Sequence, residues 1–560
     1  HRRRITENSG EPCSPFLFEI FGPPSGINKH EVKSMAQKYI IVSGGVLSGI
    51  GKGVVSSSIA RIMKEAGIKV SSLKIDPYLN VDAGTMNPNQ HGEVFVTDDG
   101  YEADLDLGHY ERFSGINMKR CNNITAGQIY KYVIEKEREG MFLGGTVQMV
   151  PHVTNEVKSR IKSIDTDLLI IEIGGTVGDI EAEIFLEAVR ELSVETGRED
   201  FMFIHVTYVP FLKVTNEFKT KPTQQSIQTL RKIGIQPDMI VVRTESEIDR
   251  QSMDKVSLFG GVAKDYVINL PDLGNIYEVP EKLHNLNIHR LISQKLKIEV
   301  SDEFSWNPPR VFDDLKIALI GKYLGTDDAY KSILESIFLC GAKKPELIDA
   351  ELLENKSEEE VKKLLERFSG IIIPGGFGRR GTEGKINTIK YARENKIPLL
   401  GICLGLQTMV IEYARNVAGL EGANSTEFDP DTKYPVIDIM EEQKKILKLG
   451  GTMRLGSQET RLFKNTKVFD IYGEEIIHER HRHRYEVNME KFGELFTTAE
   501  KNEPGKLIVS GVSDFVEVVE LKDHPFFIGV QYHPELKSKV GNPGPLFSAF
   551  VDTIRKMEKQ

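Results

Sequence analysis

One segment near the start of the chain limits the fold more than any other. An apolar run at residues 39–43, a glycine-rich stretch at 44–53 and a helical pattern from residue 54 follow one another without a break. A strand, a glycine loop and a helix in this order gather backbone N–H groups and a helix N-terminus around one hollow, which suits a phosphate group. Lys52 adds a cation to that hollow. The segment therefore predicts an α/β fold with a phosphate-binding loop.

The spacing of this loop departs from the standard phosphate-loop motif. The glycine that precedes Gly51 is one residue too far away, and Gly53 stands where a serine or threonine hydroxyl would bind magnesium. A turn that merely joins a strand to a helix is the alternative, and Lys52 and the strand–helix context favour the phosphate site. Without the hydroxyl, magnesium must be held by carboxylates and phosphate oxygens.

Two acidic segments supply candidate carboxylates. Glu172 is a lone acid inside the apolar run 168–173, where an unpaired carboxylate is costly unless a metal or a cation compensates it. An ion pair with a neighbouring lysine is the alternative for Glu172. The acidic run 98–106 is the second candidate, and it also fits a solvated surface turn.

Short apolar runs alternate with helical patterns along the first half of the chain. Near-continuous apolar strands indicate a parallel sheet with helices on both faces, a doubly wound α/β fold. The runs at 168–173, 201–206 and 239–243 have this character. A polar stretch with prolines then indicates a linker. After it, apolar strands and helical patterns alternate again, with strands expected at 316–321, 370–374 and 398–401. We therefore predict four regions: a disordered extension without an assigned role at 1–37, a first domain at 38–300, a linker at 301–314 and a second doubly wound domain at 315–557.

Bulk properties exclude several classes of protein. The net charge of −10 argues against a general nucleic-acid binder, which needs a basic surface. No run approaches the roughly 20 apolar residues of a membrane span. The four cysteines are scattered without a CxxC pair, which favours a reducing, cytoplasmic setting over a disulfide framework.

A second set of reactive residues lies in the second domain. Gly401, Cys403 and Gly405 form a G-x-C-x-G turn between a predicted strand and a predicted helix, the cysteine version of a nucleophile elbow. His533 and Glu535, separated by one proline, supply a base and a group to orient it. The glycine turn at 374–378 can present a backbone N–H to an oxyanion.

The segment 479–484 alternates arginine and histidine, so its arginines should share one face of a strand and its histidines the other. Metal binding by His481 and His483 is one interpretation. Plain exposure on the strand is the interpretation that we favour.

Several long strings resemble a known family. Residues 44–53, 74–82, 91–96, 104–113, 172–181 and 219–224 resemble the synthetase domain of CTP synthases, and the resemblance extends from about residue 39 to the end of the chain. Cys403, His533, Glu535 and the glycine loop together resemble a class I glutamine amidotransferase. The resemblance implies a glutamine-hydrolysing C–N ligase that phosphorylates the uracil 4-oxygen of UTP with ATP and then replaces it with ammonia, the last step of CTP biosynthesis.

The resemblance also implies the residues of the synthetase site. Asp106 and Glu172 would hold Mg²⁺. ATP would be bound by Gly49, Ile50, Gly51, Lys52, Gly53, Val54, Lys74, Asp106, Pro271, Asp272 and Leu273. UTP, or CTP as product, would be bound by Ser48, Asp179, Ile180, Glu181, Lys219, Thr220, Lys221, Pro222, Thr223, Gln224 and Lys255. For Lys219 and Lys221, solvated surface charge is the alternative.

In the glutaminase site, the resemblance implies Cys403 as nucleophile, His533 as proton carrier and Glu535 as the group that orients His533. Glutamine and its oxyanion would be bound by Gly376, Leu404, Gly405, Leu406, Gln407, Glu427 and Arg484. Pro88, His91 and Val94 would line the ammonia path, and GTP would activate near residues 377–381. Homotetramers, with filaments as a further open question, are the expected assembly, and neither nucleic acid nor membrane is an expected partner.

Two other functions remain open on the sequence alone. One is another phosphate-loop amidotransferase, such as an enzyme that amidates a carboxylate of a cobalamin precursor. Residues 219–224 and 179–181, which resemble a nucleoside triphosphate site, argue against this alternative. A measurement of UTP-dependent ATP hydrolysis would distinguish the two functions. The other is an inactive nucleotide-binding scaffold. The presence of a residue at every reactive position argues against it.

Overall fold

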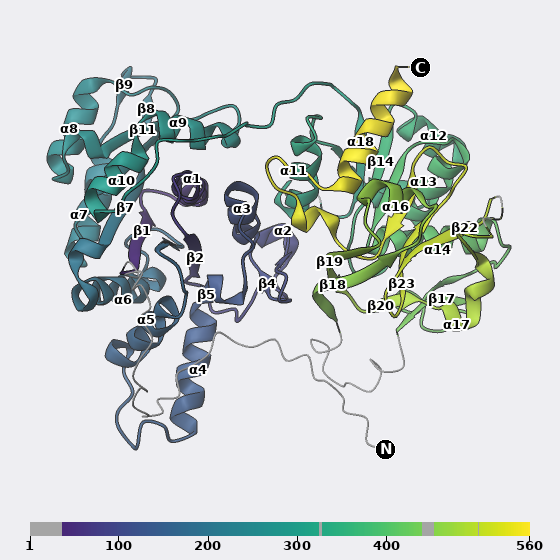
Figure 1. Cartoon of the computed structure of the whole chain (residues 1–560), viewed down its shortest axis with the longest axis horizontal. Helices are drawn as coiled ribbons and strands as arrows, with labels where there is room; N and C mark the ends of the chain where they lie inside the picture. The colour runs from purple at the N-terminus through teal and green to yellow at the C-terminus, as the bar shows by residue number, and fades with distance from the viewer. Residues whose placement is uncertain (1–35, 324–326, 440–452, 502, 504, 560) are drawn as a thin grey trace, which may run out of the picture. The chain divides into compact units, whose positions relative to one another are not determined.

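The computed structural model describes residues 36–323, 327–439, 453–501, 503 and 505–559, and its chain divides into two compact units (Figure 1). One unit contains the chain up to Asp82 and from His109 to Trp306, and the other contains Ala83–Gly108 and the chain from Asn307. The division after Trp306 falls inside the predicted linker. Residues 83–108, a segment within the predicted first domain, are grouped with the second unit. The predicted extension at 1–37 lies outside the described residues except for Ala36 and Gln37.

The first unit is built on a parallel sheet of seven strands. Their order is β11–β10–β7–β1–β6–β2–β5, and every pairing in it is parallel. The strands are β1 (Lys38–Gly44), β2 (Val70–Asp76), β5 (Asn123–Thr125), β6 (Leu168–Ile173), β7 (Phe201–Tyr208), β10 (Met239–Thr244) and β11 (Val267–Pro271). Their carboxyl ends share one edge, so the loops that follow β1, β6, β7 and β10 meet there.

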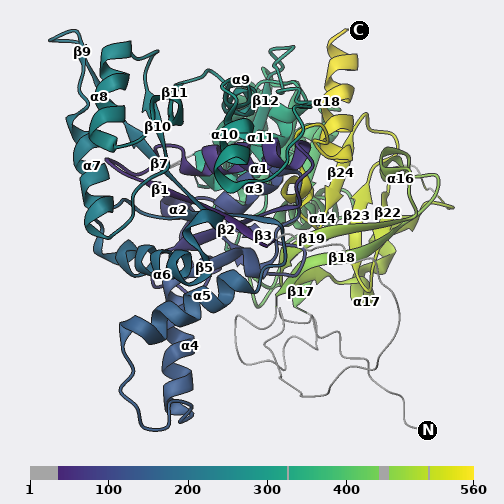
Figure 2. The same cartoon turned by 60° about the vertical axis from the view of Figure 1, so that its left-hand side comes forward.

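Helices cover both faces of this sheet, as Figures 1 and 2 show. Successive residues of β1 alternate between two cores: Tyr39 and Ile41 pack on one side, Ile40 and Val42 on the other. The first core is shared with α4 (Ala126–Arg138), α5 (Thr154–Lys162) and α6 (Ile180–Thr196), and the second with α1 (Lys52–Glu65), α9 (Val279–Asn285) and α10 (Ile288–Leu296). A smaller cluster joins β10 and β11 to α7 (Lys221–Lys232) and α8 (Arg250–Gly260). Beyond the sheet, β8 (Phe211–Leu212) pairs with β9 (Glu217–Phe218).

The second unit contains a ten-stranded mixed sheet. Its main order is β13–β12–β14–β15–β24–β23–β22–β18–β19, with β21 beside β22. The five strands β13, β12, β14, β15 and β24 pair in parallel, and the strands beyond β24 on the main path are antiparallel. The strands are β12 (Ile317–Gly321), β13 (Glu346–Asp349), β14 (Gly370–Ile373), β15 (Leu399–Ile402), β18 (Arg454–Leu462), β19 (Ile476–His483), β21 (Phe496–Thr498), β22 (Leu507–Val512), β23 (Val516–Glu520) and β24 (Phe527–Val530).

This sheet is also covered on both faces. One core includes residues of α12 (Glu358–Leu365), α13 (Thr382–Glu394) and α14 (Leu404–Asn416), and the other includes residues of α11 (Lys331–Leu339), α16 (Lys467–Tyr472) and α18 (Pro545–Glu558). A small sheet joins β16 (Asn424–Ser425), β17 (Pro435–Ile439) and β20 (Tyr485–Val487), followed by α17 (Met489–Phe492). Residues 83–108 add α2 (Pro88–His91) and a hairpin of β3 (Phe95–Val96) and β4 (Glu102–Ala103), and α3 (Leu105–Ser114) begins in this segment and ends in the first unit.

The two α/β domains predicted from the sequence are therefore confirmed. The apolar run at 168–173 is β6 to the residue, and the other predicted strands differ from the observed ones by one or two residues at an end. No helix in the described part of the chain is long and apolar enough to span a membrane.

Candidate active sites

The turn after β15 places Cys403 in a conformation that few non-glycine residues adopt. Its φ is 54°, and its side chain is 4% exposed. Both glycines of the motif are required by close approach. A Cβ at Gly401 would lie 2.9 Å from the backbone carbon of Gly405, and one at Gly405 would overlap the carbonyl oxygen of Ile373 on β14. The tight turn presents the sulfur at the N-terminus of α14, where the helix dipole favours an anion.

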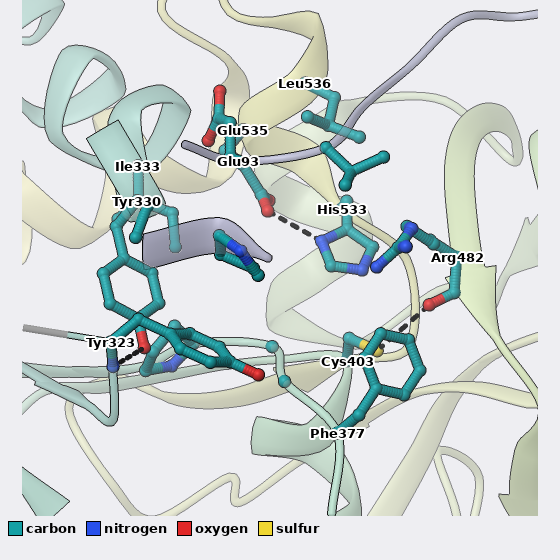
Figure 3. Close-up of a pocket in the computed structure, with 16 residues that line it drawn as sticks. Glu93, Tyr323, Tyr330, Ile333, Phe377, Cys403, Arg482, His533, Glu535 and Leu536 are labelled. Atoms are coloured by element: carbon teal, nitrogen blue, oxygen red, sulfur yellow. Dashed lines mark hydrogen bonds and ion pairs between the residues drawn. The ribbon is translucent and has the colours of Figure 1, made fainter. Parts of the chain in front are cut away.

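His533 lies beside this turn, just after β24. Its Nδ1 is 2.7 Å from Oε1 of Glu535, and its ring faces the space that holds Cys403 (Figure 3). Burial disfavours the charged imidazolium, but the Glu535 carboxylate and the Cys403 sulfur outweigh burial and raise the pKa of His533 to about 10. Nε2 of His533 has no hydrogen-bond partner among the described residues. The ring is therefore oriented by Glu535 while its other nitrogen remains available to a substrate.

Cys403, His533 and Glu535 line one cavity of the second unit (Figure 3). The same cavity is lined by residues from distant parts of the sequence: Pro88, Glu93, Val94, Tyr323, Ala329, Tyr330, Ile333, Pro374, Gly375, Gly376, Phe377, Arg482 and Leu536. Of the three residues expected on an ammonia path, Pro88 and Val94 are in this lining and His91 is not. The segment 83–108 thus contributes to the wall of the cavity that contains the nucleophile.

Two buried lysines hold the glycine loop that follows β14. Lys385 is fully buried on α13 and donates to the carbonyl oxygen of Pro374 at 2.9 Å. Lys322 follows β12 and donates to the carbonyl oxygens of Phe377 and Gly378. Because burial disfavours their charged forms, the pKa of Lys385 falls to about 7 and that of Lys322 to about 8. The carbonyl oxygens of the loop point toward these two amines. The Gly376 N–H of the same loop is therefore a candidate donor to an oxyanion.

The residues expected to bind glutamine surround the same region. Leu404, Gly405, Leu406 and Gln407 form the first turn of α14. Oε1 of Glu427 accepts from the Gly378 N–H at 2.6 Å, and burial raises the pKa of Glu427. Nε of Arg484 is buried without a hydrogen-bond partner among the described residues, and Arg484 interacts electrostatically with Glu427. Gln407 donates its side-chain amide to the Tyr485 carbonyl oxygen at 3.0 Å, so this amide supports β20.

The histidines of β19 correct one expectation. Both His481 and His483 are buried, so plain exposure on the strand was wrong. They lie on the opposite strand face from Arg480 and Arg482, which pair with Asp98 and Glu102 of the β3–β4 hairpin at 2.6 and 2.8 Å. The acidic run that begins at Asp98 is therefore not only a solvated turn.

A buried polar network surrounds the two histidines. Nδ1 of His481 and Nε2 of His483 are hydrogen-bonded at 2.9 Å, and a Glu517 carboxylate lies within metal-ligand range of both. Arg454 bridges Glu517 and Glu486 at 2.8 and 3.1 Å and supplies positive charge there. Burial lowers the pKa of both histidines well below 6.5, which keeps them neutral. This arrangement is a buried polar network in which the Arg454 guanidinium pairs with the two glutamates.

In the first unit, the glycine-rich loop expected to bind phosphate connects β1 to α1, so the predicted order of strand, loop and helix is confirmed. Lys52 is the first residue of α1, and its Nζ donates to the Gly175 carbonyl oxygen at 2.6 Å. Gly49 and Gly51 have φ of 71° and 89°, conformations in which a side chain would be strained. Gly51 also lies near Arg243, at the carboxyl end of β10.

Arg243 is a residue that the sequence analysis missed. It donates to the carbonyl oxygens of Leu270 and Pro271 at 3.1 and 3.2 Å and pairs with Asp272 at 2.6 Å. It therefore connects the phosphate loop to the segment expected to approach adenine. Arg243 could have been found from the sequence, because a charged residue near the end of an apolar strand indicates a functional site. Glu172 was found in this way, and Lys322, directly after β12, follows the same pattern.

Glu172 has the lysine neighbour that the sequence analysis left open. Nζ of Lys74 is 3.3 Å from Oε1 of Glu172 and 3.5 Å from Oδ1 of Asp76, and Tyr110 donates its hydroxyl to Glu172. All four side chains are buried in the first unit. The ion-pair interpretation is thus confirmed. The carboxyl ends of β2 and β6 carry one lysine and two carboxylates close together. Asp106, the other expected magnesium ligand, belongs to α3 in the second unit.

The string expected to bind UTP surrounds the N-terminus of α7. Thr220 is the N-cap, and the helix begins with Lys221, Pro222, Thr223 and Gln224. Lys219 pairs with Glu217, and Lys255 acts on the same carboxylate electrostatically. A helix N-terminus beside three lysines is a favourable site for phosphates. Asp179 occupies the N-cap position of α6, where its carboxylate accepts from the preceding Thr176 N–H at 3.0 Å and not from the helix. Ile180 and Glu181 form the exposed start of that helix.

Comparison with known proteins agrees with this division into two sites. A family model described as the CTP synthase N-terminus matches residues 38–298, and one described as glutamine amidotransferase class-I matches residues 326–553. The CTP synthase of Thermosipho africanus is 66% identical over 518 residues, which cover 92% of this chain and 98% of that protein. The CTP synthase of Thermotoga maritima is 65% identical, with 91% and 98% covered, and that of Sulfolobus acidocaldarius is 52% identical, with 92% and 99% covered.

Proposed function

This chain belongs to the CTP synthase family, and from that premise we propose how its residues divide the work of converting UTP to CTP. The family assignment makes it a glutamine-hydrolysing ligase of pyrimidine biosynthesis with ATP, UTP and glutamine as substrates. The observation that carries the proposal is the cavity shared by Cys403 and His533 in a chain that also has a phosphate loop around Lys52.

In the glutaminase site, the Cys403 thiol gives its proton to His533, and the sulfur attacks the side-chain amide carbon of glutamine. The resulting oxyanion accepts hydrogen bonds from the Gly376 and Leu404 N–H groups. His533 donates a proton to the departing nitrogen, which leaves as ammonia, and then takes a proton from the water that hydrolyses the thioester to glutamate. Glu535 keeps the ring oriented through Nδ1.

Glutamine is held by charges that match its α-substituents. The Glu427 carboxylate would bind the α-ammonium group, and the Arg484 guanidinium would bind the α-carboxylate. The buried Nε of Arg484, without a partner among the described residues, supports this role because a bound carboxylate would satisfy it.

In the synthetase site, the 4-oxygen of UTP attacks the γ-phosphorus of ATP, and ADP leaves. Ammonia then attacks carbon 4 of the pyrimidine, and the 4-oxygen leaves as inorganic phosphate. Lys52 and Lys74 offset negative charge on the transferring phosphoryl group, and the N–H groups of the glycine loop position the ATP phosphates. Arg243 orders the segment of Pro271, Asp272 and Leu273 beside the adenine.

UTP binds where α6 and α7 begin. The three lysines Lys219, Lys221 and Lys255 and the N-terminus of α7 would bind its triphosphate, and Ser48 and residues 179–181 complete the site. The same positions would bind CTP as a product and as a feedback inhibitor.

Glu172 of the first unit is a candidate magnesium ligand, because carboxylate oxygens are the preferred protein ligands of this cation. Glu172 already lies beside Lys74 in a buried site, where a second cation would balance Asp76 and the substrate phosphates. When bound, magnesium would neutralise phosphate charge during phosphoryl transfer.

Further parts of the proposal follow the family. Exposed apolar side chains of the first unit, among them Leu143, Ile180, Val214 and Leu258, support burial against other copies of the chain in a homotetramer. GTP would activate the glutaminase at residues 377–381, and ammonia would leave Cys403 past Pro88 and Val94. The proposed location is the cytoplasm, where these nucleotides and glutamine are present together.

The decisive experiment separates the two nitrogen sources. CTP formation from UTP and ATP is measured with glutamine and with ammonium chloride, for the wild-type protein and for Cys403→Ala. The variant should lose glutamine-dependent synthesis and keep ammonia-dependent synthesis. Cys340→Ala, which removes a thiol outside the cavity lining, is the matched control and should keep both. Retention of glutamine-dependent synthesis by Cys403→Ala would refute the assignment of the nucleophile.

A further inference from the structure

A buried histidine joins the two nucleotide-binding segments of the first unit. His205 lies on β7 and is 0% exposed. Its Nδ1 is 3.0 Å from Oγ of Ser43, the residue of β1 that precedes the phosphate loop, and its Nε2 is 2.8 Å from Oγ of Ser226 on α7. One ring therefore contacts the strand that leads into the ATP loop and the helix that carries the UTP string.

The start of the phosphate loop rests directly on this histidine. A Cβ at Gly45 would overlap Oγ of Ser226 and lie 2.9 Å from Nε2 of His205. The Gly45 N–H also donates to the Val206 carbonyl oxygen at 3.0 Å, so the loop is fixed to the residue after His205 as well. Any displacement of Ser226 or of the imidazole would be transmitted to the backbone of the loop.

The helix α7 is tied to β7 at a second point, one turn nearer its N-terminus. Oγ1 of Thr207 donates to Oγ1 of Thr223 at 3.0 Å, and Thr223 donates to the Tyr208 carbonyl oxygen at 3.0 Å. Thr223 and Ser226 are three residues apart, so they lie on the same face of the helix. The contacts of α7 with β7 thus fix the position of the turn that begins with Lys221 and Pro222.

His205 makes these contacts as a neutral ring. Burial, reinforced by the nearby Lys52 ammonium, lowers its pKa to about 3. One ring nitrogen then donates and the other accepts, and each serine hydroxyl can take the complementary role. The link is a directional pair of hydrogen bonds that adds no charge beside the phosphates.

We propose that His205 is a positioning residue that couples the ATP loop to the UTP-binding end of α7. ATP on the loop fixes Gly45 and Ser43, and through His205 and Ser226 it fixes the turn that binds the UTP triphosphate. The inference rests on the assignments of the ATP and UTP segments in the proposed function. It goes beyond them because it names the buried ring that would transmit the binding of one nucleotide to the segment that binds the other.

The two conservative replacements of His205 separate its two hydrogen bonds. The amide of glutamine reaches about as far as Nε2 and that of asparagine about as far as Nδ1. His205→Gln therefore keeps only the bond to Ser226, whereas His205→Asn keeps only the bond to Ser43. Because Gly45 of the loop packs directly against Ser226 and Nε2 of His205, glutamine keeps the link between the loop and α7 and should preserve the coupling. Asparagine loses the bond to α7 and should not.

The test measures the Kd of UTP with and without a non-hydrolysable ATP analogue, and the KM of UTP with ammonia as nitrogen source. We expect the analogue to lower the Kd of UTP in the wild type and in His205→Gln, and to have little effect in His205→Asn. The KM of UTP in His205→Asn should rise roughly tenfold, as expected from the loss of one buried hydrogen bond. The KM of ATP should rise in parallel, while glutaminase activity measured without nucleotides stays unchanged.

His524→Asn is the matched control. His524 is equally buried and neutral, with a pKa lowered to about 4, but its Nε2 is 3.1 Å from the Ala392 carbonyl oxygen in the second unit. This variant reports the general cost of replacing a buried histidine and should keep the nucleotide coupling. If His205→Asn does not fold, Ser226→Ala breaks the same link from the helix side and should lose the coupling in the same way.

Unchanged coupling in a folded His205→Asn or Ser226→Ala variant would overturn the inference, as would equal losses in His205→Asn and His205→Gln. Failure of the proposed function has a different signature, because the wild type would then show no UTP-dependent hydrolysis of ATP.

Discussion

The nucleophile illustrates how a single backbone angle determines chemistry. Cys403 is held at a φ of 54° by the Val530 carbonyl oxygen, which accepts its N–H at 2.7 Å, and by the two flanking glycines. A non-glycine residue in such a conformation costs about 1–3 kcal/mol, which the surrounding sheet must offset. The strained angle turns the sulfur into the cavity and away from the core of β15.

At the same scale, Glu535 controls the proton affinity of His533. Its carboxylate favours the protonated imidazolium, so Glu535→Gln should lower the pKa of His533 from about 10. If the paired imidazolium is the active form, the alkaline limb of the glutaminase pH profile should move to lower pH. The kcat for glutamine should fall by roughly 10²–10⁴-fold, as for other residues that orient a catalytic histidine.

The pH profile of glutamate release from pH 6 to 11 checks this prediction, with ammonia-dependent CTP synthesis as the internal control. Glu520→Gln alters another buried acid of the second unit, whose carboxylate accepts from the Lys467 and Val468 N–H groups, and should leave the profile in place. An unshifted alkaline limb in Glu535→Gln would show that Glu535 does not set the charge of His533.

Residues that belong to sequence motifs were predictable, and residues that act across the fold were not. Cys403, His533 and Glu535 could be named because their glycine or proline neighbours fix their geometry within a few residues. In the sequence, Lys385 is one polar residue among others in a helical pattern. Only the packing of α13 against the glycine loop shows that its amine binds the Pro374 carbonyl oxygen. His205 lies in an apolar strand, and nothing in the sequence indicates that Ser43 and Ser226 are its partners.

At the scale of elements, the first turn of α14 depends on its contact with β14. The helix begins where Gly405 passes the carbonyl oxygen of Ile373 so closely that no side chain fits. Leu404, the first residue of this helix, lies next to the glycine loop, since a Cβ at Gly376 would be 3.6 Å from Cδ2 of Leu404. The two proposed oxyanion donors are thus positioned by one helix–strand contact.

Gly405→Ala should therefore damage both stability and catalysis. The added methyl group must displace α14 from β14, which should lower the free energy of unfolding by about 1–3 kcal/mol. A displacement of about 1 Å at the donors should lower the glutaminase kcat by up to ~10²-fold. Thermal unfolding and glutamate release measure the two effects.

Gly493→Ala is the control for this prediction. Gly493 has an ordinary φ of −56°, and a Cβ there would be 3.8 Å from its nearest neighbour, Cε of Met489. The variant should match the wild type in both assays. If Gly405→Ala also matched the wild type, the close helix–strand approach would not be needed for activity.

Most strands were predictable because a parallel strand covered on both faces must be largely apolar, as β6 and β7 are apart from Glu172, His205 and Thr207. The β3–β4 hairpin was not predictable for the opposite reason. Its strands are two residues long, and its acidic residues fitted a metal site or a solvated turn. Their partners, Arg480 and Arg482, lie about 380 residues away in the sequence, a separation that local patterns cannot report.

At the scale of the whole molecule, the two activities should be separable from the synthetase side as well. Lys52→Ala removes the cation that we place beside the transferring phosphoryl group. CTP formation should fall by at least ~10²-fold with either nitrogen source, because charge neutralisation provides much of phosphoryl-transfer catalysis. Glutamate release without nucleotides should remain.

CTP formation by absorbance and glutamate release by a coupled assay check this prediction on one protein sample. Lys69→Ala, at an exposed lysine paired with Asp165, is the control and should keep both activities. Normal ammonia-dependent CTP formation in Lys52→Ala would contradict the assigned phosphate loop.

The grouping of residues 83–108 with the second unit has a practical consequence for producing the glutaminase part of the protein alone. A fragment that starts at Asn307 omits Asp98 and Glu102, and it also omits Glu93, whose carboxylate accepts from the Ser332 N–H at 2.8 Å. Arg480, buried in the intact chain, would then lose its ion pair with Asp98, and part of the cavity wall would be missing. A faithful stand-alone glutaminase would have to be assembled from two pieces of the gene, with the early segment grafted back through a designed connection.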